Sequence, residues 1–308
     1  MPSAGRTEPR SLLSRAGALL LALAAVPVHP APVSAQEVRS VRFVLDNDLF
    51  GLRGREAPPD HDYTHGVNVS VELSGAPRVV RWAVPAAELS TMLGLGQEVY
   101  TPREDAPEPV PGERPYAAWL YLAAGASADR GHRRDEVSVR LGVVGPPALG
   151  EEVQNGVHRL TGSRPQLGWE HQIGTRPGIV LRFEQTHRLR PLPDAGWVLL
   201  LPAWSAAAGN VEAGLGAGAR VRVGAARGAY ALVGARGEHL LWDVFLDAAE
   251  STVERIPSVG EWEAGAGWAF RRATVEYRFV ARGREYRTQA APHRWGSLGL
   301  SWHPGRSR

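Results

Sequence analysis

Apolar and polar side chains alternate along most of this chain, and this period of two limits the possible folds more than any other feature of the sequence. In the segment 67–73, for example, Val and Leu side chains alternate with Asn, Ser and Glu. Successive side chains of a β-strand point to opposite faces, so such segments are predicted to be strands. The pattern predicts about twelve strands, near residues 38–46, 64–73, 91–101, 115–126, 134–144, 175–188, 195–207, 210–223, 238–248, 260–270, 273–282 and 294–303.

Two all-β architectures produce this alternation: a soluble sandwich that buries its apolar faces, and a membrane barrel that turns them toward lipid. Three features favour the barrel. The polar faces carry many Arg, Glu and Gly residues, aromatic residues recur near strand ends, and the last strand ends in Trp302 near the C-terminus. We therefore predict a transmembrane antiparallel up-and-down β-barrel.

The first 35 residues have the features of a secretory signal. Arg6, Arg10 and Arg15 precede the apolar run 16–26, and small residues follow up to Ala35. That run is too short to cross a bilayer, which takes ~20 apolar residues. We expect residues 1–35 to be a signal peptide and residues 36–308 to be a barrel domain in the bacterial outer membrane.

The composition narrows the possible chemistry. The 308 residues include no Cys and no Lys, which excludes disulfides, thiol catalysis, Cys-ligated zinc and Schiff-base lysines. The formal net charge is +3, and the three arginines of the signal segment contribute much of it. The remaining chain is close to neutral, so its charge gives no argument for a nucleic-acid partner.

Residues 146–162 depart from the strand pattern. Their apolar side chains recur at helical spacing, which predicts a short amphipathic helix in a loop. These side chains are Leu149, Val153, Val157 and Leu160. The opposite side of the helix carries Glu151, Asn155 and His158 as one polar face. Because His158 belongs to that face, we expect its removal to cost no core packing.

Four polar segments are predicted to meet at one end of the barrel. With the start of the barrel in the periplasm, each odd-numbered strand leads into an extracellular loop. The segments are 46–48 at the end of the first strand, 62–66 at the start of the second, 100–105 after the third, and the helix after the fifth.

Each segment also has an ordinary interpretation. A polar run at a strand end is often only a turn, a strand Thr often reflects β-propensity, and a helix His is often solvated. His61 and His65 lack the Glu of a metalloprotease motif, so we do not interpret their spacing as a metal site.

Together, Asn47, Asp48, Thr64 and His158 nevertheless supply the elements of a hydrolytic site. Carboxylate and amide oxygens bind hard cations such as Ca²⁺, and an imidazole can take a proton from water. A cation in contact with an ester carbonyl stabilises the oxyanion while the water attacks. Such a site needs no Ser or Cys nucleophile.

Seven short motifs occur in order between residues 46 and 172. They are DNDLF (46–50), DYTHG (62–66), YTP (100–102), RPYAAW (114–119), GVVGP (142–146), GEEVQNGVHR (150–159) and GWEHQ (168–172). In this order they resemble the lipid A 3′-O-deacylase (LpxR) family of outer-membrane barrels. The resemblance implies a twelve-stranded barrel with a Ca²⁺-dependent site under a loop helix, which cleaves the 3′-acyloxyacyl ester of lipid A. It also implies that His158 is the general base and that Asn47, Asp48 and Thr64 shape the cation and water site.

Two positions depart from this family. Its members carry an acidic residue soon after the helix His, where this chain has the segment 163–165, Ser-Arg-Pro. The candidate metal ligands are then Asp48, Asp62 and Glu151. The family also uses a basic residue in an extracellular loop. This chain has no Lys, so Arg103 is the candidate for that position. We expect Arg103 and Arg114 to bind the substrate.

The sequence thus predicts a monomeric outer-membrane hydrolase that removes an ester-linked acyl chain from lipid A, with Ca²⁺ and a His base. Two alternatives stay open: an outer-membrane phospholipase or esterase of other specificity, and a catalytically silent barrel or pore.

Overall fold

The computed structural model describes residues 36–51, 61–77, 80–81, 87–191 and 197–305. The predicted signal peptide, residues 1–35, lies outside them. Among the described residues, no helix is both long enough and apolar enough to cross a membrane.

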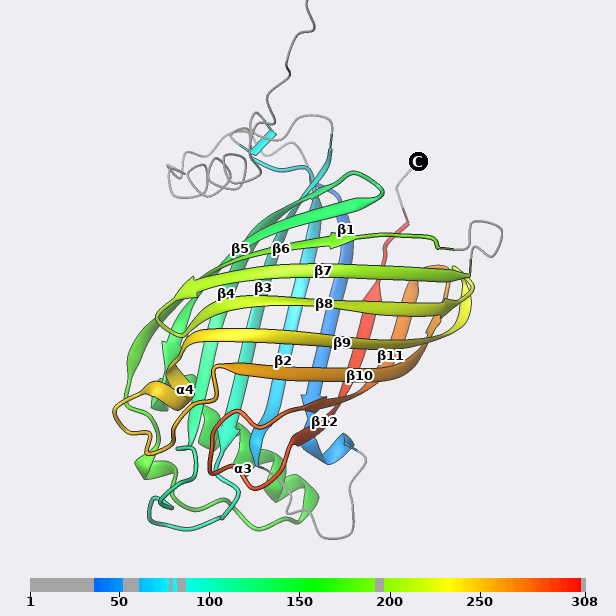
Figure 1. Cartoon of the computed structure of the whole chain (residues 1–308). Coiled ribbons are helices and arrows are strands. Elements are labelled where there is room, and N and C mark those ends of the chain that lie inside the picture. The colour runs from blue at the N-terminus through cyan, green and yellow to red at the C-terminus, as the bar shows by residue number, and fades with distance from the viewer. Residues whose placement is uncertain (1–35, 52–60, 78–79, 82–86, 192–196, 306–308) are drawn as a thin grey trace, which may run out of the picture.

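Twelve antiparallel strands close into a barrel in which each strand pairs with its neighbours in sequence, and β1 pairs with β12 (Figure 1). This confirms the predicted fold class, including the third and seventh strands. The strands are β1 (Val38–Asn47), β2 (Asp62–Ser74), β3 (Glu88–Thr101), β4 (Ala117–Asp129), β5 (Arg133–Val144), β6 (Arg176–His187), β7 (Val198–Gly209), β8 (Glu212–Gly224), β9 (Gly228–Asp243), β10 (Ser258–Ala269), β11 (Ala273–Arg282) and β12 (His293–Trp302).

Short helices lie at one end of the barrel, at the bottom in Figure 1. They are η1 (Asp48–Phe50), η2 (Pro146–Ala148), α3 (Gly150–Thr161), η3 (Trp169–His171) and α4 (Val244–Asp247). All of them follow odd-numbered strands, and the four polar segments also lie at this end. The predicted gathering of these segments at one rim is therefore confirmed.

The apolar faces of the strands point outward, which decides between barrel and sandwich. Large apolar side chains in the middle of the strands are exposed, among them Leu122 at 65 % and Val233 at 55 %. Aromatic side chains such as Trp268 and Trp302 are exposed near the strand ends. A water-soluble sandwich would bury these groups, whereas a membrane barrel presents them to lipid.

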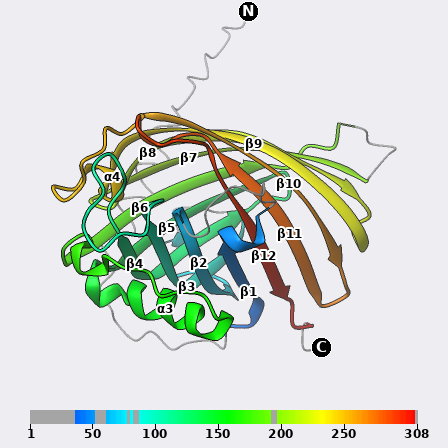
Figure 2. The same cartoon turned by 90° about the horizontal axis from the view of Figure 1, so that it is seen from below.

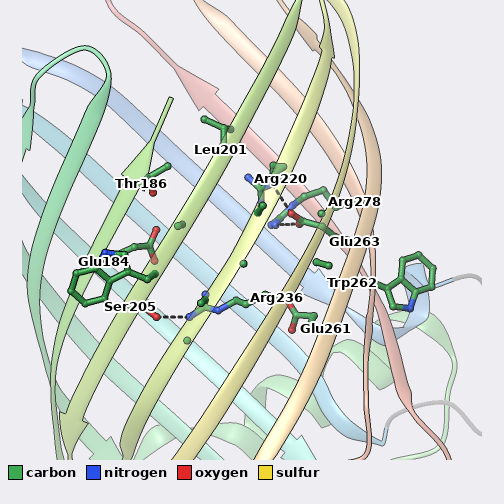
Figure 3. Close-up of a pocket in the computed structure, with 18 residues that line it drawn as sticks. Glu184, Thr186, Leu201, Ser205, Arg220, Arg236, Glu261, Trp262, Glu263 and Arg278 are labelled. Carbon is green, nitrogen blue, oxygen red and sulfur yellow. Dashed lines mark hydrogen bonds and ion pairs between the residues drawn. The ribbon is translucent and has the colours of Figure 1, made fainter. Parts of the chain in front are cut away.

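The lumen is lined by Arg and Glu side chains that pair with one another, as the polar faces of the strands predict. Glu263 is at the centre of one such group, next to a cavity of ≈ 250 Å³ (Figure 3). Its carboxylate accepts hydrogen bonds from Arg220 Nε at 2.5 Å and from Arg278 Nη1 at 2.9 Å. One carboxylate thus joins β8, β10 and β11 across the lumen.

Replacing Glu263 with Ala is expected to lower the free energy of unfolding of the barrel by about 1–3 kcal/mol, because two guanidinium groups lose their shared acceptor. The loss stays below the ~3–5 kcal/mol of a fully buried pair, since the Arg220 side chain is 36 % exposed and water screens its charge. Urea unfolding in detergent measures it. Glu184→Ala is the matched control, because Glu184 lies 3.9 Å from its Arg182 partner; equal unfolding midpoints for the two variants would contradict the prediction.

The ninth strand differs from its predicted position. We expected it at 238–248, but β9 begins ten residues earlier, and residues 244–247 form the helix α4. The early part, 228–237, is rich in Gly and Ala, so its outward face gives a weak apolar signal. At the other end, the Asp243 side chain accepts the N–H of Phe245 and caps α4, which ends the strand.

An apolar cluster lies at the extracellular end of the lumen. α4 is folded inward, and its Phe245 ring stacks on Tyr100 of β3 with centroids 4.3 Å apart. Trp119 and Val211 are fully buried in the same cluster. This packing fixes the extracellular ends of β3 and β4, which the loop 102–116 connects.

Candidate active site

The predicted loop helix exists as α3, but its polar face is turned inward. Gln154, Asn155 and His158 are buried, whereas Leu160 is 89 % exposed and Val157 is 40 % exposed. Figure 2 shows α3 along the rim beside the ends of β2, β3 and β4. His158 therefore packs against its surroundings, and the expectation that its removal costs no packing is wrong. The pattern of the helix is amphipathic in either orientation, so the pattern alone does not say which side is covered.

His158 is held in one orientation by the chain that follows the helix. Its Nδ1 lies 2.5 Å from the carbonyl oxygen of Arg164. A carbonyl oxygen only accepts, so this contact assigns the proton to Nδ1 and makes Nε2 the basic nitrogen. A main-chain carbonyl thus orients the imidazole.

A cavity of ≈ 540 Å³ lies beside His158 between α3 and the barrel rim. It brings together segments far apart in sequence: the end of β1, the loop after β3 and the loop after α3. Its lining residues are Asn47, Leu49, Arg103, Glu104, Asp105, Val157, His158, Thr161, Ser163, Arg164 and Gln166. Three predicted site residues, Asn47, Arg103 and His158, therefore share one cavity.

Two more predicted residues, Asp48 and Thr64, are buried at the same rim but do not line the cavity. Asp48 directly follows Asn47, is 3 % exposed, and its Oδ2 accepts the N–H of His61 at 3.1 Å. Asn47 caps η1 by accepting the N–H of Leu49, which turns the chain at the end of β1. Thr64 is buried, and its hydroxyl shares a 2.7 Å hydrogen bond with that of Thr101 at the end of β3.

The cavity also contains two carboxylates that the sequence analysis did not select, Glu104 and Asp105. The Asp105 carboxylate accepts the N–H of Leu167 at 2.6 Å and so joins the loop after β3 to the loop after α3. On the other side of that loop, Asn155 accepts the N–H of Gln166 at 2.8 Å. The sequence signal that could have identified Glu104 and Asp105 was their position in a predicted rim loop, next to Arg103.

The other three predicted residues, Glu151, Arg114 and Asp62, do not line this cavity either. Glu151 is exposed in the first turn of α3, about 10 Å along the helix from His158 at 1.5 Å per residue. Arg114 is 1 % exposed, and its Nη1 lies 3.3 Å from Glu285 and 3.8 Å from Asp62. This buried group ties the loop after β3 to β2 and to the loop before β12.

The charges in that group stabilise one another. Burial raises the pKa of Glu285, but Arg282 and Arg114 outweigh burial and hold the pKa below its usual value. Burial likewise opposes the charge of Arg114, and Glu285 and Asp62 raise the pKa of Arg114 above its usual value. Both groups are therefore charged at neutral pH, and Arg114 positions loops instead of facing the cavity.

Comparison with known proteins agrees with this architecture. A model of the family described as outer membrane protein LpxR matches residues 18–304. The chain belongs to the LpxR family. It is accordingly an outer-membrane barrel, as the sequence predicts. No curated protein sequence matches the chain.

The solved structure of a relative shows the same fold as this LpxR family member. LpxR from Salmonella typhimurium is similar with a TM-score of 0.71 and 21 % identity, over 86 % of this chain and 100 % of that chain. The β-domain of the Bordetella autotransporter BrkA matches with a TM-score of 0.46 and 11 % identity, over 86 % of this chain and 98 % of that chain.

Proposed function

We propose that this LpxR family member is a monomeric hydrolase that removes an ester-linked acyl or acyloxyacyl chain from lipid A in the outer leaflet. The observation that carries the proposal is the cavity at the rim with the oriented imidazole of His158 in its wall. Water bound there can lose a proton to Nε2 and attack an ester carbonyl, and no nucleophilic side chain is required.

The walls of the cavity suit a substrate with one apolar and one anionic part. Leu49 and Val157 border it with exposed apolar side chains, and Leu160 continues that apolar surface along α3. Arg103 and Arg164 line the same cavity. An acyl chain fits the apolar border while phosphates or carbonyl oxygens meet the arginines, which places an ester near His158.

The oxygen donors present suit a Ca²⁺ ion. Asn47, Glu104 and Asp105 line the cavity, and the buried Asp48 directly follows Asn47. We propose that these residues, together with Thr64, hold the ion and the water. Hard oxygen ligands of this kind are those that Ca²⁺ prefers. Bound Ca²⁺ supplies positive charge for the ester oxygen. Asp62 and Glu151 lie outside this donor set.

The direct test is mass spectrometry of lipid A and of phospholipids from cells that express the gene and cells that lack it. We expect lipid A that has lost one acyl or acyloxyacyl chain, and unchanged phospholipids. Phospholipid hydrolysis with intact lipid A would support the alternative lipase. Unchanged lipids of both classes, with the barrel correctly assembled, would support a silent barrel.

A further inference from the structure

Two histidines and an aspartate meet where the barrel closes. His61 and Asp62 stand at the start of β2, and His293 is the first residue of β12. One ligand atom from each of the three lies within 4.8 Å of the others, and the two imidazole rings meet edge to face with centroids 5.1 Å apart. β1 separates the two strands but ends at Asn47, so the side chains meet beyond its end.

His293 presents a lone pair to this cluster. Its Nε2 lies 2.8 Å from the carbonyl oxygen of Tyr63, which assigns the proton to Nε2 and leaves Nδ1 as an acceptor. His293 is 0 % exposed, and its Nδ1 has no hydrogen-bond partner among the described residues. Metal-binding histidines typically donate their other ring N–H to a carbonyl in this way.

The Asp62 carboxylate is oriented by hydrogen bonds from neighbouring side chains, as carboxylate ligands of metals usually are. Its Oδ2 accepts Gln289 Nε2 at 2.9 Å, and its Oδ1 accepts the Tyr286 hydroxyl at 3.2 Å. Such outer contacts orient carboxylates at metal sites. The nearby Arg114 does not leave the cluster positive, because Glu285 balances its charge at 3.3 Å.

We propose that His61, Asp62 and His293 form a second metal site that binds Zn²⁺ and links the first and last strands at the extracellular rim. Two imidazoles and one carboxylate are a zinc donor set, whereas Ca²⁺ requires six to eight oxygens. Tetrahedral zinc with bonds of ~2.0–2.1 Å places ligand atoms ~3.3 Å apart. Rotation of the His61 side chain, which is only partly buried, shortens its separation from the other two.

The test uses the full-length protein, purified in detergent, stripped with a chelator and titrated with Zn²⁺ alone and with Ca²⁺ alone. We expect one tightly bound Zn²⁺ per chain by elemental analysis and calorimetry, and a higher melting temperature with Zn²⁺. His61→Ala and His293→Gln should each weaken zinc binding by more than the ~10–100-fold that loss of an outer-shell partner costs. In His293→Gln, the amide N–H preserves the bond to the Tyr63 carbonyl while the Nδ1 ligand is removed.

Two variants locate the bound ion. His65→Ala changes a third histidine of the same segment, and His158→Ala changes the proposed base; both should retain the zinc. His61→Ala keeps the test decisive if His293→Gln does not fold, because His61 is only partly buried. Absence of saturable zinc binding by the wild-type chain would overturn the proposal, as would zinc that is lost in His65→Ala or His158→Ala but retained in His61→Ala.

Discussion

The His158→Ala variant is expected to lose lipid A deacylation by ~10²–10⁴-fold in rate, the usual contribution of a general base. The reason is the geometry of the imidazole: the Arg164 carbonyl fixes the proton on Nδ1, so Nε2 is the basic nitrogen of the ring. Single-turnover hydrolysis of lipid A in detergent, followed by mass spectrometry, measures the rate.

Because His158 is buried, this variant also loses packing, and a second variant separates the two effects. In His158→Asn, the amide N–H can still donate to the Arg164 carbonyl, but the side chain carries no basic nitrogen. We expect it to unfold like the wild type and to be as inactive as His158→Ala. His171→Ala, an exposed histidine of the same loop, should keep full activity. Activity of His158→Asn within a few-fold of the wild type would show that His158 only positions the loop.

The barrel could be predicted from sequence because the side-chain pattern of each strand depends only on the two environments that its faces meet. In a strand between lipid and a polar lumen, apolar and polar residues alternate whichever strands it pairs with. Segments such as 67–73 and 298–302 can therefore be recognised as strands from their own sequence. Where the outward side chains are small, as in 228–237, that signal disappears, and β9 was placed too late in the chain. The strand count was right, and with it the order of strands and the parity that places the loops at one rim.

The candidate site could be predicted only in part. Asn47, Arg103 and His158 stand in local motifs, and strand parity is enough to place them at one rim. The orientation of α3 could not be predicted, because at a membrane surface an amphipathic helix can direct its apolar face outward to lipid. In that orientation His158 and Asn155 are buried, whereas Val157 and Leu160 are exposed.

Contacts between distant segments left no trace in the sequence. Asp62 meets Gln289 and His61 meets His293 across more than 220 residues, and only the closed barrel brings them together. The spacing of His61 and His65 was not interpreted as a metal site, and nothing in the sequence pairs His61 with His293. Arg114 was assigned to the substrate, whereas the fold buries its charge and uses it to hold loops together.

The proposed reaction is expected to need a high concentration of Ca²⁺, because the chain has an arginine at position 164. The Arg164 side chain is exposed and borders the cavity, so it places positive charge beside the donors Asn47 and Asp105. Removing ligand charge weakens Ca²⁺ sites, and weak extracellular sites bind at ~10⁻⁴–10⁻³ M. We therefore expect chelation to abolish activity and Ca²⁺ at about that concentration to restore it.

Replacing Arg164 with Glu should lower the Ca²⁺ concentration needed for half-maximal activity by about tenfold or more, because the change replaces a repelling charge with an oxygen ligand. The main-chain carbonyl that orients His158 is retained, so any change reports on the cation rather than on the base. Arg159→Glu makes the same charge change on the exposed side of α3, outside the cavity lining, and should leave the requirement unchanged. Restoration by Ca²⁺ but not by Zn²⁺ separates this cation from the site at His293. Undiminished activity in excess chelator would show that the reaction uses no dissociable cation, and equal Ca²⁺ requirements in the two variants would place the ion away from Arg164.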